Sequence, residues 1–183
     1  LFTSGSTKLP KAVITTQRML CANQQMLLQT FPVFGEEPPV LVDWLPWNHT
    51  FGGSHNLGIV LYNGGSFYLD DGKPTAQGFA QTLRNLKEVS PTAYLTVPKG
   101  WEELVSALEQ DAELRACLFK RVSLFFFAAA GLSQSVWDRL DRVAEQHCGE
   151  RIRMMAGLGM TEAAPSCTFT TGPLSMAGYI GLP

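Results

Sequence analysis

The first residues of the chain combine the side chains and the backbone freedom that bind phosphate groups. In LFTSGSTKLPKAV, hydroxyl groups, a glycine and two lysines lie between an apolar Leu1-Phe2 pair and an apolar segment that begins at Ala12. Backbone N–H groups of such a turn and Ser/Thr hydroxyls donate hydrogen bonds to phosphate oxygens, while lysine neutralises their charge. The stretch predicts a polyphosphate-binding loop, with an ordinary polar loop between a strand and a helix as the alternative.

A second stretch, DWLPWNHTFGGSHN, is dense in aromatic rings, imidazoles and glycines. His49 and His55 are six residues apart, a spacing that does not place them on one helical face, so a shared metal ion is not expected. Gly52 and Gly53 would leave space for a flat ring to approach the backbone. The residues alone leave open whether His49 is a hydrogen-bonded histidine at a helix start or a residue with a functional contact. The aromatic residues that could line a slot for the ring, or pack in the core, are Trp47, Phe51 and Tyr94.

Several better-known motifs are excluded. GSTKLPK lacks the Gly-Lys-Ser/Thr ending of a Walker loop, and no Gly-x-Ser-x-Gly nucleophile elbow occurs in the chain. GLGMTE begins like a dinucleotide fingerprint, but Glu162 occupies the place of the third glycine. The sequence therefore predicts neither a Walker-type nucleotide site, nor a hydrolase with a nucleophile elbow, nor a dinucleotide-binding site.

Composition indicates a globular domain. The chain has 183 residues, 45% of them apolar and 16% charged, with a formal net charge of −2. This balance argues against a general nucleic-acid binder or a polybasic membrane surface, and no apolar run approaches the length of a membrane span. The four cysteines form no Cys-x-x-Cys pair, so reduced thiols in a cytoplasmic protein are expected. Because the chain begins at Leu1 and ends abruptly on GYIGLP, we expect it to be a piece of a longer protein.

Apolar periodicity alternates between two kinds of segment, which must position the polar stretches. Residues 18–31, 78–89 and 136–148 repeat apolar side chains at helical spacing, and Ser133 or Ser135 is a candidate N-cap of the third helix. Short apolar runs at 40–45, 65–70, 92–97, 123–129 and 151–158 are typical of buried strands. Strands alternating with helices predict an α/β fold with a mostly parallel sheet flanked by helices, whose ligand binds where strands end.

The opening loop resembles the phosphate loop of the adenylate-forming superfamily, which contains acyl-CoA synthetases, luciferases and peptide-synthetase adenylation domains. Lys8 and Ala12 stand where the family pattern has glycines. The resemblance implies that Lys11 is catalytic and that the loop holds the β- and γ-phosphates of ATP. The positions that match the pattern in order are Thr3, Ser4, Gly5, Ser6, Thr7, Pro10 and Lys11.

Three later segments extend this resemblance over residues 1–183. MMAGLGMTEAAP is similar to the Tyr-Gly-Met-Thr-Glu signature, which implies that Thr161 contacts the α-phosphate and that Glu162 holds Mg²⁺. Leu158 stands in place of the family's adenine-packing aromatic residue. FFFAAAGLSQSVW resembles the segment that lies along adenine, and GYIGLP resembles a further family segment. The resemblance also implies that His49 is catalytic and orients or gates the substrate carboxylate. The remaining implied contacts are Ala129, Ala130, Gly131 and Gly159 with the nucleotide, and His49, Gly52, Gly53, Tyr94 and Gly157 with the acyl substrate.

LPWNHTFGG, ITTQRML and GLGMTEAAP together look most like feruloyl-CoA synthetases, enzymes of aromatic acid catabolism. The implied reaction is ATP-dependent activation of a carboxylic acid, a hydroxycinnamic acid by this resemblance, to an acyl-adenylate and then to its CoA thioester. ATP, Mg²⁺ and coenzyme A are the implied cofactors and co-substrates. A fatty-acyl or benzoyl-type CoA ligase and a non-catalytic nucleotide-binding module remain alternatives.

The resemblance also implies the place of this segment in a longer chain. Residues 1–183 correspond to the central part of the AMP-binding N-terminal domain, without that domain's first part and without the C-terminal lid domain. The ribose-binding aspartate and a catalytic lysine of the family lie beyond the position of Pro183. We therefore expect residues 1–183 alone to be inactive and prone to self-association through uncovered apolar surface. No nucleic-acid or membrane partner is expected.

Overall fold

A parallel sheet forms the centre of the molecule. The structure is a computed structural model that describes residues 1–3, 9–174 and 176–183. Strands β5 (Ala93–Thr96), β6 (Leu124–Phe127) and β7 (Arg153–Gly159) are parallel, and β8 (Ser166–Phe169) pairs antiparallel with β7. A second parallel pair, β3 (Val40–Asp43) and β4 (Ser66–Leu69), joins this sheet where the Thr92 N–H donates to the Val40 carbonyl at 3.0 Å. Near the N-terminus, β1 (Phe2–Thr3) pairs antiparallel with β2 (Lys11–Ala12).

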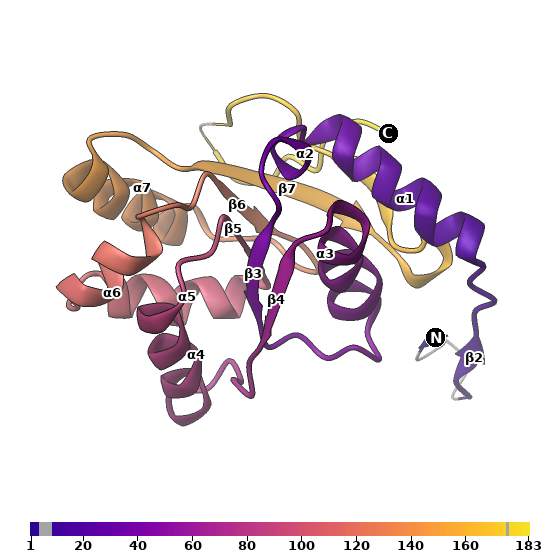
Figure 1. Ribbon diagram of the computed structural model, residues 1–183, viewed down its shortest axis with the longest axis horizontal. Helices are drawn as coiled ribbons and strands as arrows, with labels where there is room; N and C mark the ends of the chain where they lie inside the picture. The colour runs from indigo at the N-terminus through magenta and orange to yellow at the C-terminus, as the bar shows by residue number, and fades with distance from the viewer. Residues whose placement is uncertain (4–8, 175) are drawn as a thin grey trace.

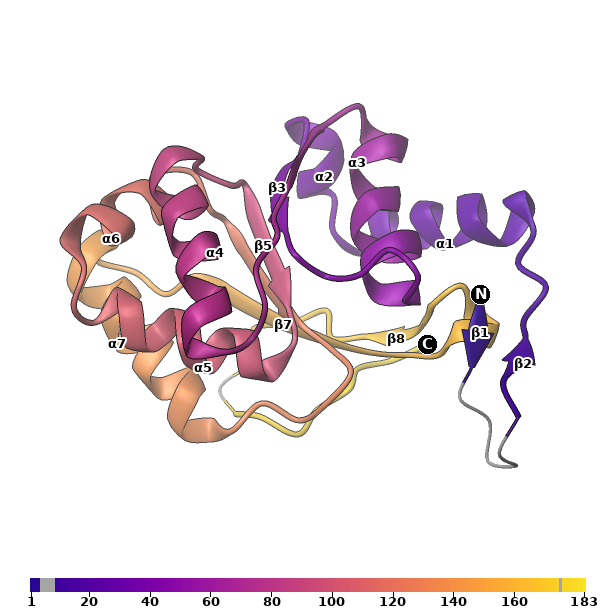
Figure 2. The same ribbon diagram turned by 90° about the horizontal axis from the view of Figure 1, so that it is seen from below.

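Helices cover both faces of the sheet, so the predicted α/β fold is confirmed (Figures 1 and 2). A short π-helical segment, η1 (Phe51–Asn56), leads directly into α3, and a 3₁₀ turn, η2 (Thr161–Ala163), follows β7. The α-helices are α1 (Gln17–Thr30), α2 (Val33–Glu36), α3 (Leu57–Asn63), α4 (Ala76–Glu88), α5 (Pro98–Leu108), α6 (Ala112–Leu118) and α7 (Gln134–Cys148).

Alternation along the central strands builds two separate cores. In β6, Phe125 and Phe127 belong to a core cluster with residues of α4 to α7, whereas Leu124 and Phe126 belong to a second cluster with residues of α1 to α3. Successive side chains of a strand point to opposite faces, and a strand buried on both faces must therefore be apolar throughout. This requirement explains the continuous LFFF run of β6. Figure 2 shows the two helical layers on either side of the strands.

Side-chain caps start four of the helices. The hydroxyl of Ser133 accepts from the Val136 N–H at 3.4 Å, so Ser133 rather than Ser135 is the N-cap of α7. Thr16, Thr75 and Asp111 cap α1, α4 and α6 in the same way. An oxygen acceptor before the first turn satisfies an otherwise unpaired helix N–H, which fixes where each helix begins.

Sequence analysis did not predict helices α2, α3, α5 and α6 or strands β1, β2 and β8. A signal for α5 is present in the sequence: Pro98 stands at its first turn, and Trp101, Leu104, Val105 and Leu108 repeat at helical spacing. Of the helices in the described part of the chain, none has both the length and the apolar character needed to cross a membrane.

Candidate functional site

A cavity of about 60 Å³ opens at the carboxyl ends of β6 and β7. It has room for several water-sized groups. Carboxyl ends of parallel strands are the usual ligand-binding edge of α/β sheets. The cavity wall comes from three segments that sequence analysis singled out separately and from both ends of β8. Its residues are His49, Thr50, Phe51, His55, Phe126, Ala128, Ala129, Gly157, Leu158, Gly159, Pro165, Ser166 and Phe169.

The end of β6 reaches the cavity through a strained turn. Ala129 has a φ of 74°, in the left-handed region that residues other than glycine rarely adopt, and its neighbour Ala128 also lines the cavity. Non-glycine residues in this region cost free energy and concentrate at functional sites. Ala130 and Gly131 are exposed and lie outside the cavity wall. Of the predicted adenine-side residues on this segment, the structure therefore brings Ala129 to the cavity.

The end of β7 reaches the cavity because it carries glycines. A Cβ on Gly157 would lie 2.9 Å from the Thr168 carbonyl oxygen, and a Cβ on Gly159 would lie 2.7 Å from the Pro165 carbonyl oxygen. Glycine at both positions lets β7 lie close to the returning chain. Between them, Leu158 lines the cavity with its side chain 44% exposed. These three predicted residues come together.

His49 lies at the exposed rim of the cavity, where both interpretations of this residue apply. Its Nδ1 accepts a hydrogen bond from the Phe51 N–H at 3.2 Å, as expected of a histidine at a helix start. Its side chain also lines the cavity. Because the hydrogen bond from the Phe51 N–H restricts rotation of the His49 side chain, the ring presents a defined edge to a ligand.

The expected role of Gly52 and Gly53 needs correction. A Cβ on Gly52 would lie 2.7 Å from the carbonyl oxygens of Leu45 and Pro46, and one on Gly53 would lie 2.2 Å from that of Trp47. Protein backbone already fills the space beside both glycines. Their missing side chains therefore allow η1 to pack on residues 45–47, and they do not make room for a substrate ring.

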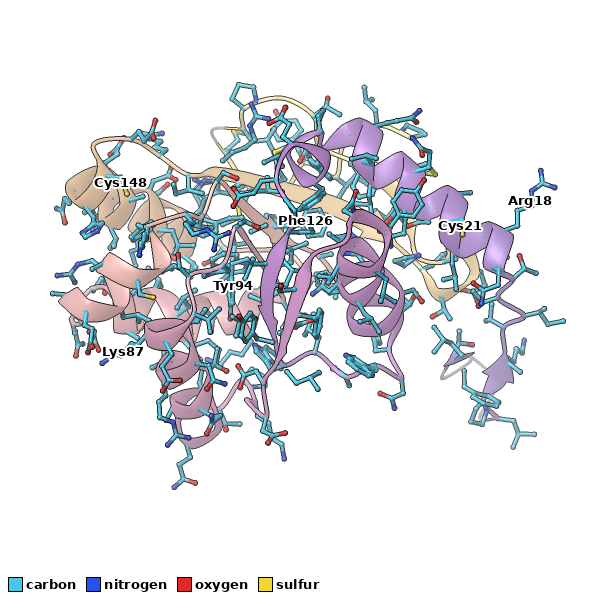
Figure 3. The ribbon with its side chains drawn as sticks, viewed as in Figure 1. Arg18, Cys21, Lys87, Tyr94, Phe126 and Cys148 are labelled. Carbon is cyan, nitrogen blue, oxygen red and sulfur yellow. The ribbon has the colours of Figure 1, made fainter. Side chains whose placement is uncertain are left out.

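Tyr94 is also wrongly predicted as a substrate contact. Its ring is 1% exposed, packs edge-on against Trp101 with ring centroids 5.3 Å apart, and lies outside the cavity wall. In Figure 3, Tyr94 and Phe126 lie apart, and they belong to the cores on opposite faces of the sheet. Trp47 likewise packs against Phe67 away from the cavity. Of the three aromatic residues proposed for a slot, only Phe51 lines it.

Sequence analysis missed a buried polar network behind the cavity. The Asn56 amide nitrogen donates to Asp43 Oδ2 at 2.8 Å and approaches the Leu95 carbonyl oxygen at 3.4 Å. The Asn56 amide oxygen lies 2.9 Å from His55 Nδ1, and Asp43 Oδ1 accepts from the Leu45 N–H at 2.9 Å. All three side chains are at most 5% exposed. The network connects the cavity wall to the carboxyl end of β3.

Burial shifts the two titrating groups of this network in opposite directions. Loss of solvation is the main cause that raises the pKa of Asp43 to about 6 from an ordinary 3.8. The hydrogen bonds from Leu45 and Asn56 lower this pKa, and the negative charge of nearby Asp70 raises it. Loss of solvation lowers the pKa of His55 from 6.5 to about 4, and the hydrogen bond with Asn56 offsets part of this decrease because it raises the pKa. At neutral pH the folded protein therefore carries an ionised Asp43 and a neutral His55.

These shifts predict opposite pH dependences for two variants. Near pH 5, folded wild-type protein holds the proton on Asp43 and the unfolded chain holds it on His55, so the pair binds equal numbers of protons in both states. In Asp43→Asn only the depressed histidine remains, and the free energy of unfolding should fall as the pH drops from 6.5 to 4. In His55→Phe only the raised carboxyl remains, and the free energy should fall as the pH rises from 4 to 6. Each slope should differ from wild type by about 1 kcal/mol per pH unit.

Urea unfolding of wild type and both variants at half-unit pH steps measures these slopes. The readout is the difference in slope from wild type, which is independent of any constant loss of stability caused by the substitution. Three parallel curves would contradict the opposite shifts.

The predicted phosphate and metal residues lie outside the cavity wall. Thr161 and Glu162 form η2, immediately after the cavity-lining end of β7, and the Glu162 side chain is exposed. Lys11 is exposed on β2, opposite Thr3 on β1. Figures 1 and 2 both place this hairpin at the end of the molecule where β7 turns into β8. The predicted contacts of Ser4, Gly5, Ser6 and Thr7, and the position of Lys8, lie outside the described residues.

The residues around η2 are compatible with Mg²⁺. Glu162 is an exposed carboxylate, and no described residue forms an ion pair with it. No group of three or more His, Cys, Asp or Glu side chains that could hold a metal occurs among the described residues. Mg²⁺ is commonly bound by one or two carboxylates together with substrate phosphates, and an exposed carboxylate without an ion-pair partner among the described residues is compatible with that requirement.

Comparisons with known proteins agree on one family. A family model described as AMP-binding enzyme matches residues 1–183. A long-chain-fatty-acid–CoA ligase of Gallus gallus is 26% identical over 129 residues, which is 67% of this chain and 16% of that ligase. A solved malonyl-CoA ligase with methylmalonyl-CoA and AMP bound superposes with a TM-score of 0.75 at 28% identity, over 100% of this chain and 37% of that one.

A third comparison adds a ligase that acts on an aromatic acid. A solved anthranilate CoA ligase in complex with anthranoyl-AMP has a TM-score of 0.72 at 19% identity, over 100% of this chain and 33% of that one. At this identity the similarity shows the shared fold. The chain spans about a third of the solved ligases and less of the chicken ligase.

Proposed function

Because this chain belongs to the AMP-binding enzyme family, we propose that it forms the nucleotide- and acyl-binding part of an AMP-forming acid–thiol ligase. The observation that carries the proposal is that one cavity at the carboxyl edge of the sheet is lined by several of the predicted stretches. At this cavity the end of β6, the end of β7 and the segment from His49 to His55 meet. Sequence analysis had singled out each of these three stretches for chemistry.

In the proposed first half-reaction, a substrate carboxylate oxygen attacks the α-phosphorus of ATP and pyrophosphate leaves. Positioning and charge stabilisation carry such a step, since a carboxylic acid is already ionised at neutral pH. Ala129, Gly157 and Gly159 would border the nucleotide and the acyl group, and His49 would orient the carboxylate at the rim. In the second half-reaction, the sulfur of coenzyme A attacks the acyl carbonyl carbon and AMP leaves.

Charged and hydroxyl groups of the opening loop and of η2 would hold the phosphates. Lys11 would neutralise the β- and γ-phosphates together with the hydroxyls of its loop, and Thr161 would donate to the α-phosphate. Glu162 would hold Mg²⁺, which neutralises phosphate charge when it is bound. Adenine would lie along the segment from Ala129 to Gly131, against the exposed side chain of Leu158.

For the acyl group, we propose a hydroxycinnamic acid such as ferulic acid. The similarity of LPWNHTFGG and GLGMTEAAP to feruloyl-CoA synthetases supports this choice. A fatty acid is the second candidate, because the chicken relative is named as a long-chain-fatty-acid–CoA ligase. The aromatic wall formed by Phe51, Phe126 and Phe169 would suit an apolar acyl group of either kind.

Acid-dependent exchange of labelled pyrophosphate into ATP tests the proposal. With full-length protein, ATP and Mg²⁺, we expect exchange with ferulate to exceed exchange with benzoate, octanoate and malonate, and exchange without acid to remain at background. Residues 1–183 alone should give background exchange with every acid. Full-length protein that gives no exchange with any acid would contradict the ligase function, and preference for octanoate would replace the acyl assignment.

A further inference from the structure

Two polar atoms of the cavity wall, His55 Nε2 and Thr50 Oγ1, are buried and have no hydrogen-bond partner among the described residues. His55 is 2% exposed and lines the cavity, and its Nε2 is unpaired within the described part of the chain. A buried polar atom without a partner costs free energy comparable to a lost hydrogen bond. Such an atom at a cavity wall is therefore a position where a ligand group can supply the missing bond.

The buried network determines what kind of bond Nε2 can make. The Asn56 amide nitrogen faces two acceptors, the Asp43 carboxylate and the Leu95 carbonyl, so the Asn56 amide oxygen must face His55. An amide oxygen only accepts, which places the proton of a neutral imidazole on Nδ1. Nε2 then carries a lone pair and acts only as an acceptor.

Packing holds the imidazole in this position. Its ring stacks on Phe126 with centroids 5.1 Å apart and an interplanar angle of 25°, and it meets Phe51 edge-on at 5.3 Å. Both aromatic rings also line the cavity. Because ring contacts and the bond to Asn56 fix the side chain, the acceptor is preorganised and pays little entropy when a ligand binds.

We propose that His55 Nε2 is a specificity determinant that accepts a hydrogen bond from a hydroxyl or amine N–H on the acyl group of the substrate. This inference rests on the proposed ligase function and extends it to a substrate class: acids whose acyl group carries a donor away from the carboxylate. An acid with that donor supplies the hydrogen bond that Nε2 lacks, whereas an acid without it leaves Nε2 unpaired and gains no such bond. The neighbouring Phe51 and Phe126 rings supply apolar contacts that do not distinguish the two kinds of acid.

Pairs of acids with matched shape test the inference in the full-length protein. The pairs are 4-hydroxycinnamate with 4-methylcinnamate, 4-hydroxybenzoate with 4-methylbenzoate, and 8-hydroxyoctanoate with nonanoate. For the acid class that the protein adenylates best, we expect kcat/KM for the hydroxyl acid to exceed that for its methyl partner by about 10- to 100-fold. The ratio within one preparation is insensitive to the fraction of folded enzyme.

Two variants assign the effect to His55. In His55→Phe, which keeps a flat ring but removes the acceptor, the ratio should fall to about 1, mainly through loss of activity with the hydroxyl acid. Thr50→Val is the matched control, because Thr50 Oγ1 is another unpaired buried polar atom on the cavity wall within the described residues. In this control the ratio should stay above about 10. If His55→Phe does not fold, the ¹⁵N resonance of His55 Nε2 is measured in wild type with each acid of a pair. We expect the donor-bearing acid to shift this resonance and its methyl partner to leave it unchanged.

The outcomes separate this inference from the function on which it rests. Absence of acid-dependent exchange with every acid overturns the ligase function and this inference with it. Exchange with a ratio near 1 in wild type for every pair overturns only the role of His55. The role of His55 is also overturned if the high ratio of kcat/KM values persists in His55→Phe. The same holds if that ratio is lost in Thr50→Val and retained in His55→Phe.

Discussion

Replacement of Trp101 by alanine should lower the free energy of unfolding by about 3–5 kcal/mol, the range for large aromatic residues in well-packed cores. Trp101 is fully buried on α5, with ring centroids 5.3 Å from Tyr94 and 4.7 Å from Phe125. Its indole N–H also donates to the Phe126 carbonyl at 3.3 Å. The substitution leaves a cavity between α5 and the central sheet and removes this hydrogen bond.

Trp47 provides a matched control for this loss. It is 49% exposed and makes an edge-on contact with Phe67. Trp47→Ala should cost less than about 1 kcal/mol, because exposed side chains away from the core contribute little to stability. Urea unfolding followed by far-UV circular dichroism measures both variants. Equal losses in the two variants would contradict the central position of Trp101 in the core.

The importance of Trp101 shows which parts of the fold the sequence predicts. The parallel strands β5, β6 and β7 of the central sheet were predicted because each lies in a short run that is rich in branched or aromatic residues and is bounded by polar or glycine residues. The predicted run 123–129, for example, contains β6 at Leu124–Phe127. Helix α5 was missed although Trp101 and Leu104 begin a helical repeat, because Pro98 and Gly100 resemble loop residues when they are considered alone. Pro98 occupies the first turn of α5, where a missing N–H costs nothing.

The site was predictable only where one segment carries its own signal. Gly157, Leu158 and Gly159 were singled out because they are adjacent in one motif, and all three line the cavity. The hydrogen bond between Asn56 and Asp43 joins residues 13 apart whose types are unremarkable in isolation, and it exists because β3 and η1 meet below the cavity. The prediction that Gly52 and Gly53 of η1 leave space for a substrate ring was wrong for a related reason. A glycine that makes room for a ligand and one that makes room for backbone look identical until the neighbouring chain is placed.

Substitution of Glu162 by glutamine should reduce kcat/KM for adenylation by about 100-fold or more in the full-length protein. This expectation rests on the proposed role of Glu162 as the Mg²⁺ carboxylate. Glutamine keeps the size of the side chain and removes the charge that a hard cation requires, and loss of such a metal contact removes several kcal/mol of charge stabilisation. Because Glu162 is exposed and no described residue forms an ion pair with it, the fold should not depend on it.

Glu150 is the matched control for the metal role. It is an exposed glutamate just after α7, outside the cavity wall, so Glu150→Gln removes the same charge without a predicted contact to the nucleotide. Initial rates of pyrophosphate exchange over a range of Mg²⁺ concentrations separate the two variants. Glu162→Gln should need more Mg²⁺ to reach half of its maximal rate, whereas Glu150→Gln should follow wild type. Unchanged exchange and Mg²⁺ dependence in Glu162→Gln would show that the metal is held by other groups.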